Sequence, residues 1–303
     1  MEDNNQVEES QEEVLDAPPP KLVIDQAYIE NRPLSYSSLK QFRKSPKHFI
    51  KYLTEPGKGS DAMSLGSLID CLALTPAKFE KRFKVIGEKP NLRTNAGKAE
   101  WAKILTEASE GKQTLVTNEQ MKTAKYCVES LMDTPESRRL IEGRSATQVS
   151  LEWRDKTNNL PMVGYVDFES KAYEEDWIVD LKSTKDADPD EVRKSIFSDD
   201  LQYYLQGGCY LEGYHRAKFR FPYFVNLFIE TVSPYNVSVN YYDKKMTELA
   251  VSEFTGTLQA FRYCMDNQLF HQGYEFRLPE SMNYFTITKP GWWKPRYGDK
   301  DLK

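Results

Sequence analysis

Long apolar stretches are missing from this sequence of 303 residues, and none approaches the roughly 18 residues that a helix needs to span a bilayer. The first residues are acidic and lack the basic-then-apolar order of a signal peptide. Both absences argue against membrane insertion and secretion. We therefore expect a soluble protein of the cytoplasm that has no membrane partner.

Cysteine is the second scarce component, with four in the whole chain. These cysteines are far apart, lie among apolar or aromatic residues and include no C-x-x-C pair. A disulfide framework, a structural zinc site and an iron–sulfur cluster are therefore not expected. The sequence predicts four reduced, buried thiols, at Cys71, Cys127, Cys209 and Cys264.

A strong excess of basic charge is absent as well, because 41 basic residues face 46 acidic ones. Seven of the acidic residues lie within residues 1–20, which contain no base and end in three prolines. This composition predicts a disordered acidic tail over residues 1–20. The remaining residues, 21–303, are nearly neutral and are interpreted as a single domain. Net charge therefore neither favours nor excludes nucleic acid as a partner.

Helical patterns dominate the first half of that domain, over about residues 34–142. Apolar residues at helical spacing predict a buried helix over Asp61–Leu74. Before it, Pro46 is expected to divide Ser35–Leu53 into two helices. In the first of these, a serine followed three residues later by Gln41 predicts a capping box.

Further helices are predicted within residues 97–142. Thr117 followed by Gln120 can cap one of them, and Thr134-Pro135 can open another because proline is tolerated in the first turn. We interpret this whole stretch as additional helices that precede a sheet in the sequence.

Near Ala146 the pattern changes to the alternation of apolar and polar residues that is typical of strands. Strands are predicted from Ala146 onward, at Leu160–Phe168 and at Trp177–Ser183. After a polar loop, the sequence predicts a helix at Asp200–Tyr214, strands at Tyr223–Thr231 and Val237–Tyr242, and a helix at Thr247–Asn267. This order predicts an α/β fold with a central mixed sheet flanked by helices, whose core covers about residues 146–270.

Two aspartates and a lysine stand out on the predicted strands. Alternate residues of a strand face the same side, so Asp180 and Lys182 share one face. If the strand that carries Asp167 is adjacent, two carboxylates and an ammonium meet. Such a group suits Mg²⁺ or Mn²⁺, with the lysine orienting a water for phosphodiester hydrolysis. The alternative is a surface ion pair, but the apolar run Trp177–Val179 favours a buried Asp180 that needs a partner or a metal.

Other polar residues fall where burial is expected. Asp70 has apolar neighbours on its predicted helix and is either a third metal ligand or the partner of a buried donor. Gln202, Gln206 and Tyr210 recur every four residues and therefore share one helix face. They form either a polar stripe or a row of hydrogen-bonding groups directed at the site or at DNA.

These motifs together resemble the PD-(D/E)XK nuclease superfamily in its RecB/RecE-like branch. The segments Gly66–Pro76 and Trp177–Thr184 are most similar to RecE-type (exodeoxyribonuclease VIII-like) exonucleases of phages and prophages. The resemblance spans about residues 34–215 and implies a restriction-endonuclease-like core. The motifs that carry it are Gly164-x-x-Asp167, Asp180-x-Lys182 and Gln206-Gly-Gly-Cys-Tyr210.

The resemblance assigns roles to individual residues. It makes Asp167 and Asp180 metal ligands, Lys182 the catalytic lysine, and Gln206 with Tyr210 a pair that positions the substrate or supports the site. Glu152 matches an acidic position of the branch, for which a water-mediated metal contact is implied. Asp70 stands where relatives usually carry histidine, and an aspartate can itself bind Mg²⁺ or Mn²⁺.

The resemblance also implies an activity and partners. It points to a Mg²⁺-dependent exonuclease that digests double-stranded DNA ends, with 5′ to 3′ polarity, in the cytoplasm of a bacterium or a phage-infected host. Its products would serve a single-strand annealing recombination protein, and relatives act as ring-shaped homo-oligomers. The alternatives are an endonuclease or single-strand nuclease of the same fold, and a DNA-binding or assembly protein that has lost catalysis.

Contacts with DNA phosphates would come from local basic clusters rather than from net charge. One cluster lies in the first predicted helices and another follows the Gln206 helix. Near the C-terminus, Gly291–Tyr297 mixes tryptophans with bases, which suits base stacking or packing onto the domain. The basic candidates are Lys40, Arg43, Lys44, Lys47, Lys51, Arg216, Lys218 and Arg220.

Overall fold

The computed structural model describes residues 26–55, 61–87 and 90–278. The predicted acidic tail, at residues 1–20, and the tryptophan-containing segment Gly291–Tyr297 lie outside these ranges. Within the described residues, no helix combines the length and the apolarity required to cross a membrane. All four cysteines are buried and free, as the sequence predicts.

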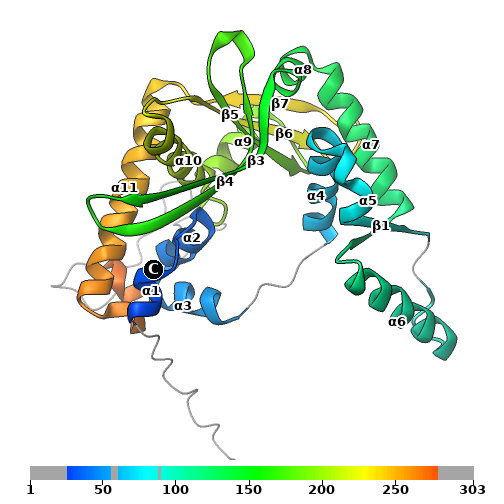
Figure 1. Ribbon diagram of the computed structural model, residues 1–303, viewed down its shortest axis with the longest axis horizontal. Helices are drawn as coiled ribbons and strands as arrows, with labels where there is room; N and C mark the ends of the chain where they lie inside the picture. Colours follow the sequence, from blue (N-terminus) through cyan, green and yellow to red (C-terminus); the bar gives the residue numbers. More distant parts are fainter. Residues whose placement is uncertain (1–25, 56–60, 88–89, 279–303) are drawn as a thin grey trace, which may run out of the picture.

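A five-stranded mixed sheet forms the centre of the fold (Figure 1). Its strands stand in chain order, and only the third and fourth, β5 and β6, run parallel, whereas the other neighbours are antiparallel. This arrangement confirms the predicted α/β class. The strands are β3 (Arg144–Asp155), β4 (Leu160–Ser170), β5 (Trp177–Thr184), β6 (Tyr223–Glu230) and β7 (Val237–Tyr241).

Helices cover both faces of this sheet and enclose two hydrophobic cores. Successive residues of β5 point to opposite faces, so Ile178 belongs to one core and Val179 to the other. The Ile178 side is covered by α2 (Tyr36–Lys44), α3 (Pro46–Thr54), α10 (Tyr203–Lys218) and α11 (Lys244–Asp266). The Val179 side is covered by α4 (Asp61–Leu74), α7 (Asn118–Asp133) and α8 (Pro135–Glu142). Figure 1 shows α10 and α11 on one side of the sheet and α4 and α7 on the other.

The N-terminal part differs from its prediction because it is not entirely helical. It contains a separate two-stranded parallel sheet, formed by β1 (Phe83–Ile86) and β2 (Thr114–Thr117). Strands of four residues are too short to show a reliable alternation in sequence. The other helices of this part are α1 (Gln26–Asn31), α5 (Phe79–Arg82) and α6 (Asn95–Glu110).

Two further segments differ from the sequence interpretation. The capping box of α2 uses Ser35 and Ser38 instead of a serine with Gln41. The segment predicted as a polar loop before α10 contains α9 (Pro189–Phe197), in which only Val192 and Ile196 are buried and the apolar signal is correspondingly weak. In contrast, the capping box between Thr117 and Gln120 is confirmed at the start of α7.

Helix α10 approaches its neighbours unusually closely because two glycines face them. A Cβ on Gly208 would lie 2.1 Å from the carbonyl oxygen of Ala250 on α11. A Cβ on Gly207 would lie 2.7 Å from the ring of Tyr242 and 3.0 Å from that of Phe224 on β6. The helix is therefore wedged between α11 and the sheet, which brings its polar residues over β5.

The first prediction concerns this contact. Gly208→Ala should lower the free energy of unfolding by about 2 kcal/mol or more, because the added methyl group meets backbone that cannot move alone. Gly256→Ala, on α11, is the control, since a Cβ there has no atom within 4 Å. It should stabilise the protein by up to about 1 kcal/mol through helix propensity. Urea unfolding followed by circular dichroism measures both, and equal effects would contradict the packing argument.

Candidate active site

The site forms where β4 and β5 stop pairing. Their ladder comprises three residue pairs and ends at Phe168 and Val179. One residue beyond, Asp167 Oδ2 accepts a hydrogen bond of 2.7 Å from the backbone N–H of Leu181. The carboxylate thus replaces the backbone acceptor that a continued ladder would supply, and it lies beside Asp180 on the neighbouring strand.

Asp180 is buried, with 1% of its surface exposed. Its Oδ1 accepts a 3.0 Å hydrogen bond from Gln206 Nε2, and its Oδ2 forms an ion pair with Lys182 Nζ. Asn226 Nδ2, on the paired residue of β6, lies 3.4 Å from the same Oδ2. The sequence argument that Asp180 and Lys182 share a face, and that a buried Asp180 needs partners, is confirmed.

Lys182 remains an ammonium in these surroundings. Burial by itself lowers the pKa of its amine, but the nearby Asp180 and Asp167 carboxylates outweigh that effect and raise the pKa above its ordinary value. Its Nζ also lies 4.9 Å from the centre of the Tyr203 ring, within the range of a cation–π contact. The positive charge of Lys182 therefore lies next to the two carboxylates.

Asp167 is in the opposite situation, because its surroundings disfavour the charged form of its side chain. Burial, followed by the negative charge of Asp180, holds the pKa of its carboxyl well above the usual range, although Lys182 and the Leu181 N–H oppose this. Two carboxylates this close repel each other when both are ionised. A divalent cation or additional positive charge between them would relieve that repulsion.

Asp70 enters from the other side, on α4. Gly66 allows this helix to approach β5, since a Cβ there would lie 2.9 Å from Ser183 Oγ. The Asp70 carboxylate accepts a 3.1 Å hydrogen bond from Gln148 Nε2 and lies 3.7 Å from Arg82 NH1. Burial raises its pKa, Arg82 lowers it, and Asp180 contributes a smaller increase. Asp70 is thus close enough to interact with the aspartate pair, but it already has two partners of its own.

Gln206 and Tyr210 both face the site from α10, as the four-residue spacing predicts. Gln206 Nε2 donates to Asp180 and also lies 3.0 Å from the Tyr210 hydroxyl, while its Oε1 is buried without a hydrogen-bond partner among the described residues. The glycine of the Gly164-x-x-Asp167 motif makes room for Tyr210, because a Cβ there would lie 3.1 Å from its ring. Gln202 does not join this row, since it precedes the helix in a left-handed conformation.

Sequence reasoning missed two residues behind Asp180. Asn226 is fully buried, and its Oδ1 accepts a 3.0 Å hydrogen bond from the hydroxyl of Tyr242. Tyr242, Asn226 and Asp180 therefore form a continuous hydrogen-bonded chain that fixes the orientation of the Asp180 carboxylate. The signal was present, because Asn226 is a polar residue within the apolar strand Tyr223–Glu230, which is the argument that singled out Asp180.

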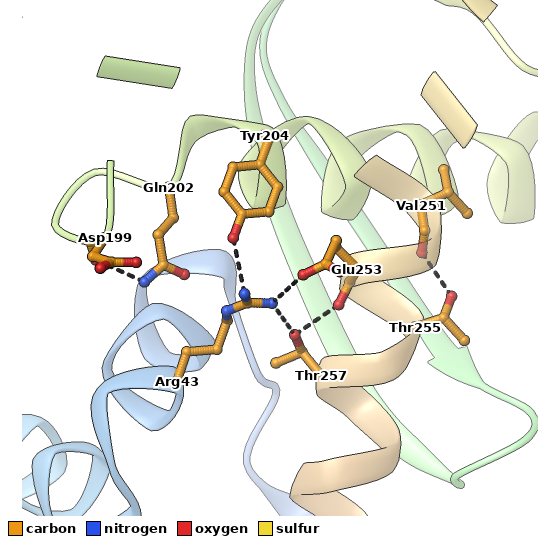
Figure 2. Close-up of polar contacts among 8 residues, drawn as sticks. All are labelled: Arg43, Asp199, Gln202, Tyr204, Val251, Glu253, Thr255 and Thr257. Atoms are coloured by element: carbon orange, nitrogen blue, oxygen red, sulfur yellow. Dashed lines mark hydrogen bonds and ion pairs between the residues drawn. The ribbon is translucent and has the colours of Figure 1, made fainter. Parts of the chain in front are cut away.

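Two other groups of predicted residues are not brought to the carboxylates. Glu152 pairs with Val163 on β4, four residues and so about 13 Å along the strand from Asp167, and it is exposed. Arg43 donates instead to Glu253, Thr257 and Tyr204 and joins α2 to α10 and α11 (Figure 2). Several other basic candidates also have acidic partners: Lys44 with Asp200, Lys51 with Glu55, Arg216 with Glu212, Lys218 with Glu169 and Arg220 with Asp176.

The carboxylates of the site form a partial donor set for a divalent metal. Within residues 26–55, 61–87 and 90–278, no three His, Cys, Asp or Glu residues already stand close enough to hold an ion. The Asp167 and Asp180 pair nevertheless fits Mg²⁺, which is commonly held by one or two carboxylates and completes its shell with water and substrate phosphates. Asp70 could add a third carboxylate, which also contacts Arg82 and Gln148.

Comparison with known proteins places the fold. Residues 35–272 match a family described as a PDDEXK-like domain of unknown function (DUF3799). The chain belongs to this family. Among solved structures, it is similar to a "Putative exonuclease" from Eubacterium rectale, with a TM-score of 0.52 and 14% sequence identity over 83% of this chain and 87% of that one. A search of curated proteins finds no match.

Membership in the PDDEXK-like family agrees with the arrangement around Asp167, Asp180 and Lys182. The similarity to the solved structure shows a shared fold, with helices flanking a mixed sheet. PDDEXK nucleases generally use divalent metals, and the aspartate pair of this chain is suited to one.

The second prediction tests the chain of hydrogen bonds behind Asp180. Tyr242→Phe removes the hydroxyl that binds Asn226 Oδ1 and leaves a buried acceptor without its donor. The free energy of unfolding should fall by about 1–2 kcal/mol. The matched control is Tyr241→Phe, because the neighbouring Tyr241 is 67% exposed and its loss should change stability little. Equal values for the two variants in urea unfolding would contradict this arrangement.

The third prediction concerns the raised pKa of Asp167. The folded state favours its protonated form, so the wild-type protein loses stability from this group as pH rises above the unfolded pKa of about 4. Asp167→Asn removes the ionisation. The variant should match the wild type near pH 4 and exceed its free energy of unfolding by about 1 kcal/mol or more at pH 7. A difference that stays constant between these pH values would refute the assignment.

Proposed function

We propose that this protein is a divalent-metal-dependent DNA exonuclease, with Mg²⁺ as the ion and Mn²⁺ as the second candidate. The observation that carries the proposal is the placement of Asp167, Asp180 and Lys182 at the point where β4 and β5 separate. A pair of repelling carboxylates next to an ammonium provides both the attraction for a cation and a donor for a water or a phosphate oxygen.

The residues of the chain divide the chemical work. Asp167 and Asp180 would hold the ion, which supplies a Lewis acid that neutralises charge on the phosphodiester. Gln206 and Asn226 fix the orientation of the Asp180 carboxylate through its two oxygens. Lys182 stays protonated and can donate a hydrogen bond to the attacking water or to a phosphate oxygen. Tyr210 supports this arrangement, because its hydroxyl accepts a hydrogen bond from the same Gln206 amide that binds Asp180.

The substrate and the biological setting follow from the RecE-type resemblance. We infer that the protein digests double-stranded DNA ends with 5′ to 3′ polarity and leaves single strands for an annealing recombination protein. A homo-oligomer that surrounds the duplex would keep the enzyme on its substrate.

The fourth prediction tests catalysis directly. Lys182→Ala and Asp180→Asn should each lower the Mg²⁺-dependent digestion of end-labelled linear duplex DNA by about a hundredfold or more. Lys185→Ala is the matched control, because this lysine lies on the same segment but is exposed and outside the site. Release of labelled nucleotide is measured over time. Full activity in the Lys182→Ala variant would overturn the assignment.

The same assay separates the alternative activities. Digestion of linear duplex but not of covalently closed DNA identifies an exonuclease, whereas cutting of closed duplex identifies an endonuclease. Digestion confined to single strands identifies a single-strand nuclease.

A DNA-binding protein without catalysis is a second candidate, and one observation favours it. Asp70, at the position where relatives usually carry histidine, is already engaged by Arg82 and Gln148. Intact DNA binding without cleavage in Mg²⁺, Mn²⁺ or Co²⁺ would support this candidate. Detectable cleavage by the wild type in any of the three ions would exclude it.

A further inference from the structure

A cavity of about 700 Å³ lies beside the start of α10, between α2, α11 and the short 3-10 helix Tyr274–Arg277. Its volume falls within the range of about 300–1,000 Å³ that is usual for small-molecule sites. None of the residues of the carboxylate site lines it.

One buried group in the cavity lacks a partner. Gln202 lines it and is only 4% exposed. Its Nε2 donates a 2.7 Å hydrogen bond to the carbonyl oxygen of Asp199, whereas its buried Oε1 meets no donor among the described residues. In Figure 2 this oxygen is turned toward the space beside the Arg43 guanidinium. A buried acceptor without a donor costs roughly 1–3 kcal/mol, which a ligand with an N–H or O–H group would recover.

The backbone conformation of Gln202 is also energetically unfavourable. Gln202 adopts the left-handed conformation, with φ of 49° and ψ of 45°, directly before the first residue of α10. Residues other than glycine, asparagine and aspartate rarely adopt it, and such positions concentrate at ligand sites. The strain and the free acceptor occur in one residue.

The walls of the cavity combine aromatic and basic side chains with three acidic ones, Asp199, Asp200 and Glu253. Phe42, Tyr274 and Phe276 supply aromatic surface. Arg43 is held rigidly by Glu253, Thr257 and Tyr204, so the wall opposite Gln202 is fixed before any ligand arrives (Figure 2). Arg277 is exposed, lines the cavity and forms no ion pair within the part of the chain that the structure describes.

Positive charge connects the cavity with the carboxylate site. Gln202 is followed by Tyr203, whose ring lies 4.9 Å from Lys182 Nζ. Lys40 interacts electrostatically with a lysine of each region, because its pKa is lowered first by burial and then by the charges of Lys44 and Lys182. Lys44 itself lines the cavity, where it pairs with Asp200. Lys40 is thus flanked by the ammonium groups of Lys182 and Lys44, which are paired with Asp180 and Asp200, and a phosphate of a DNA strand would neutralise the charge of Lys40.

We propose that this cavity binds one nucleotide of the DNA strand next to the bond that is cleaved, with Gln202 Oε1 accepting a hydrogen bond from an N–H group of the base. The inference rests on the proposed nuclease function and names the part of the substrate that the enzyme holds. Every DNA base carries an N–H group on its pairing edge, so the cavity requires an unpaired base without selecting its identity. The phosphate lies toward Arg277.

The test is a binding measurement that needs no catalysis. The full-length protein is titrated with dAMP in the presence of EDTA by isothermal calorimetry, with deoxyribose 5-phosphate as the ligand that lacks a base. Gln202→Met, which keeps the shape and removes the acceptor, should weaken dAMP binding about fivefold to tenfold. Gln268→Met is the matched control, because Gln268 has the same left-handed backbone, with φ of 56°, but is exposed and outside the cavity. It should bind dAMP as the wild type does.

Arg277→Ala provides an independent variant at an exposed residue, in case Gln202→Met does not fold. It should weaken binding of dAMP severalfold and leave binding of deoxyadenosine unchanged, because only the phosphate contact is lost. The proposal is overturned if the wild type does not bind dAMP, if deoxyribose 5-phosphate binds equally well, or if neither variant changes the affinity. A wild type that digests DNA but binds no dAMP would remove the cavity proposal alone. Loss of the nuclease assignment would instead appear as unchanged digestion by Lys182→Ala.

Discussion

The burial of the Asp180 carboxylate constrains everything around it. An ionised group with almost no access to water is tolerated only when its charge and its lone pairs are matched by nearby donors. The partners come from three elements: Lys182 from the same strand, Asn226 from the adjacent parallel strand and Gln206 from α10. The register of the sheet and the position of the helix are therefore both tied to one carboxylate.

The same constraint explains the glycines of α10. Gln206 reaches Asp180 only if the helix lies close to the sheet, and Gly207 and Gly208 permit that approach on two sides. Gly164 does the same for Tyr210 from the side of β4. Small residues thus set the geometry of the polar ones, which is why a motif of polar residues is interspersed with glycines.

Much of this arrangement could be predicted from the sequence, because its signals are local. The alternation along β5 placed Asp180 and Lys182 on one face, and the four-residue spacing placed Gln206 and Tyr210 together on α10. The strands of the central sheet were long enough, and regular enough, to be recognised. The motifs also pointed to the superfamily in which the chain is found.

What the sequence did not reveal depends on contacts between distant segments. The pairing of Asp180 with Asn226 requires the parallel register of β5 and β6, and the contacts of Asp70 with Arg82 and Gln148 join three separate elements. Glu152 lies on the expected strand, but the register of β3 against β4 places it away from the site. Short elements such as β1, β2 and α9 carry too few apolar residues to show a period.

The parallel pairing of β5 with β6 has a consequence for how the protein reaches its folded state. Parallel neighbours cannot be joined by a tight turn, so residues 185–222 must cross over the sheet, and this crossover contains α9 and α10. The segment that connects β5 to β6 thus also places Gln206 next to Asp180. The hairpin of β3 and β4 can form from local contacts, but the polar centre assembles only when this long-range connection is complete. Topologies that depend on such distant contacts fold slowly. A chain arrested before the crossover would have formed the β3–β4 hairpin but not the contacts of Asp180 with Gln206 and Asn226.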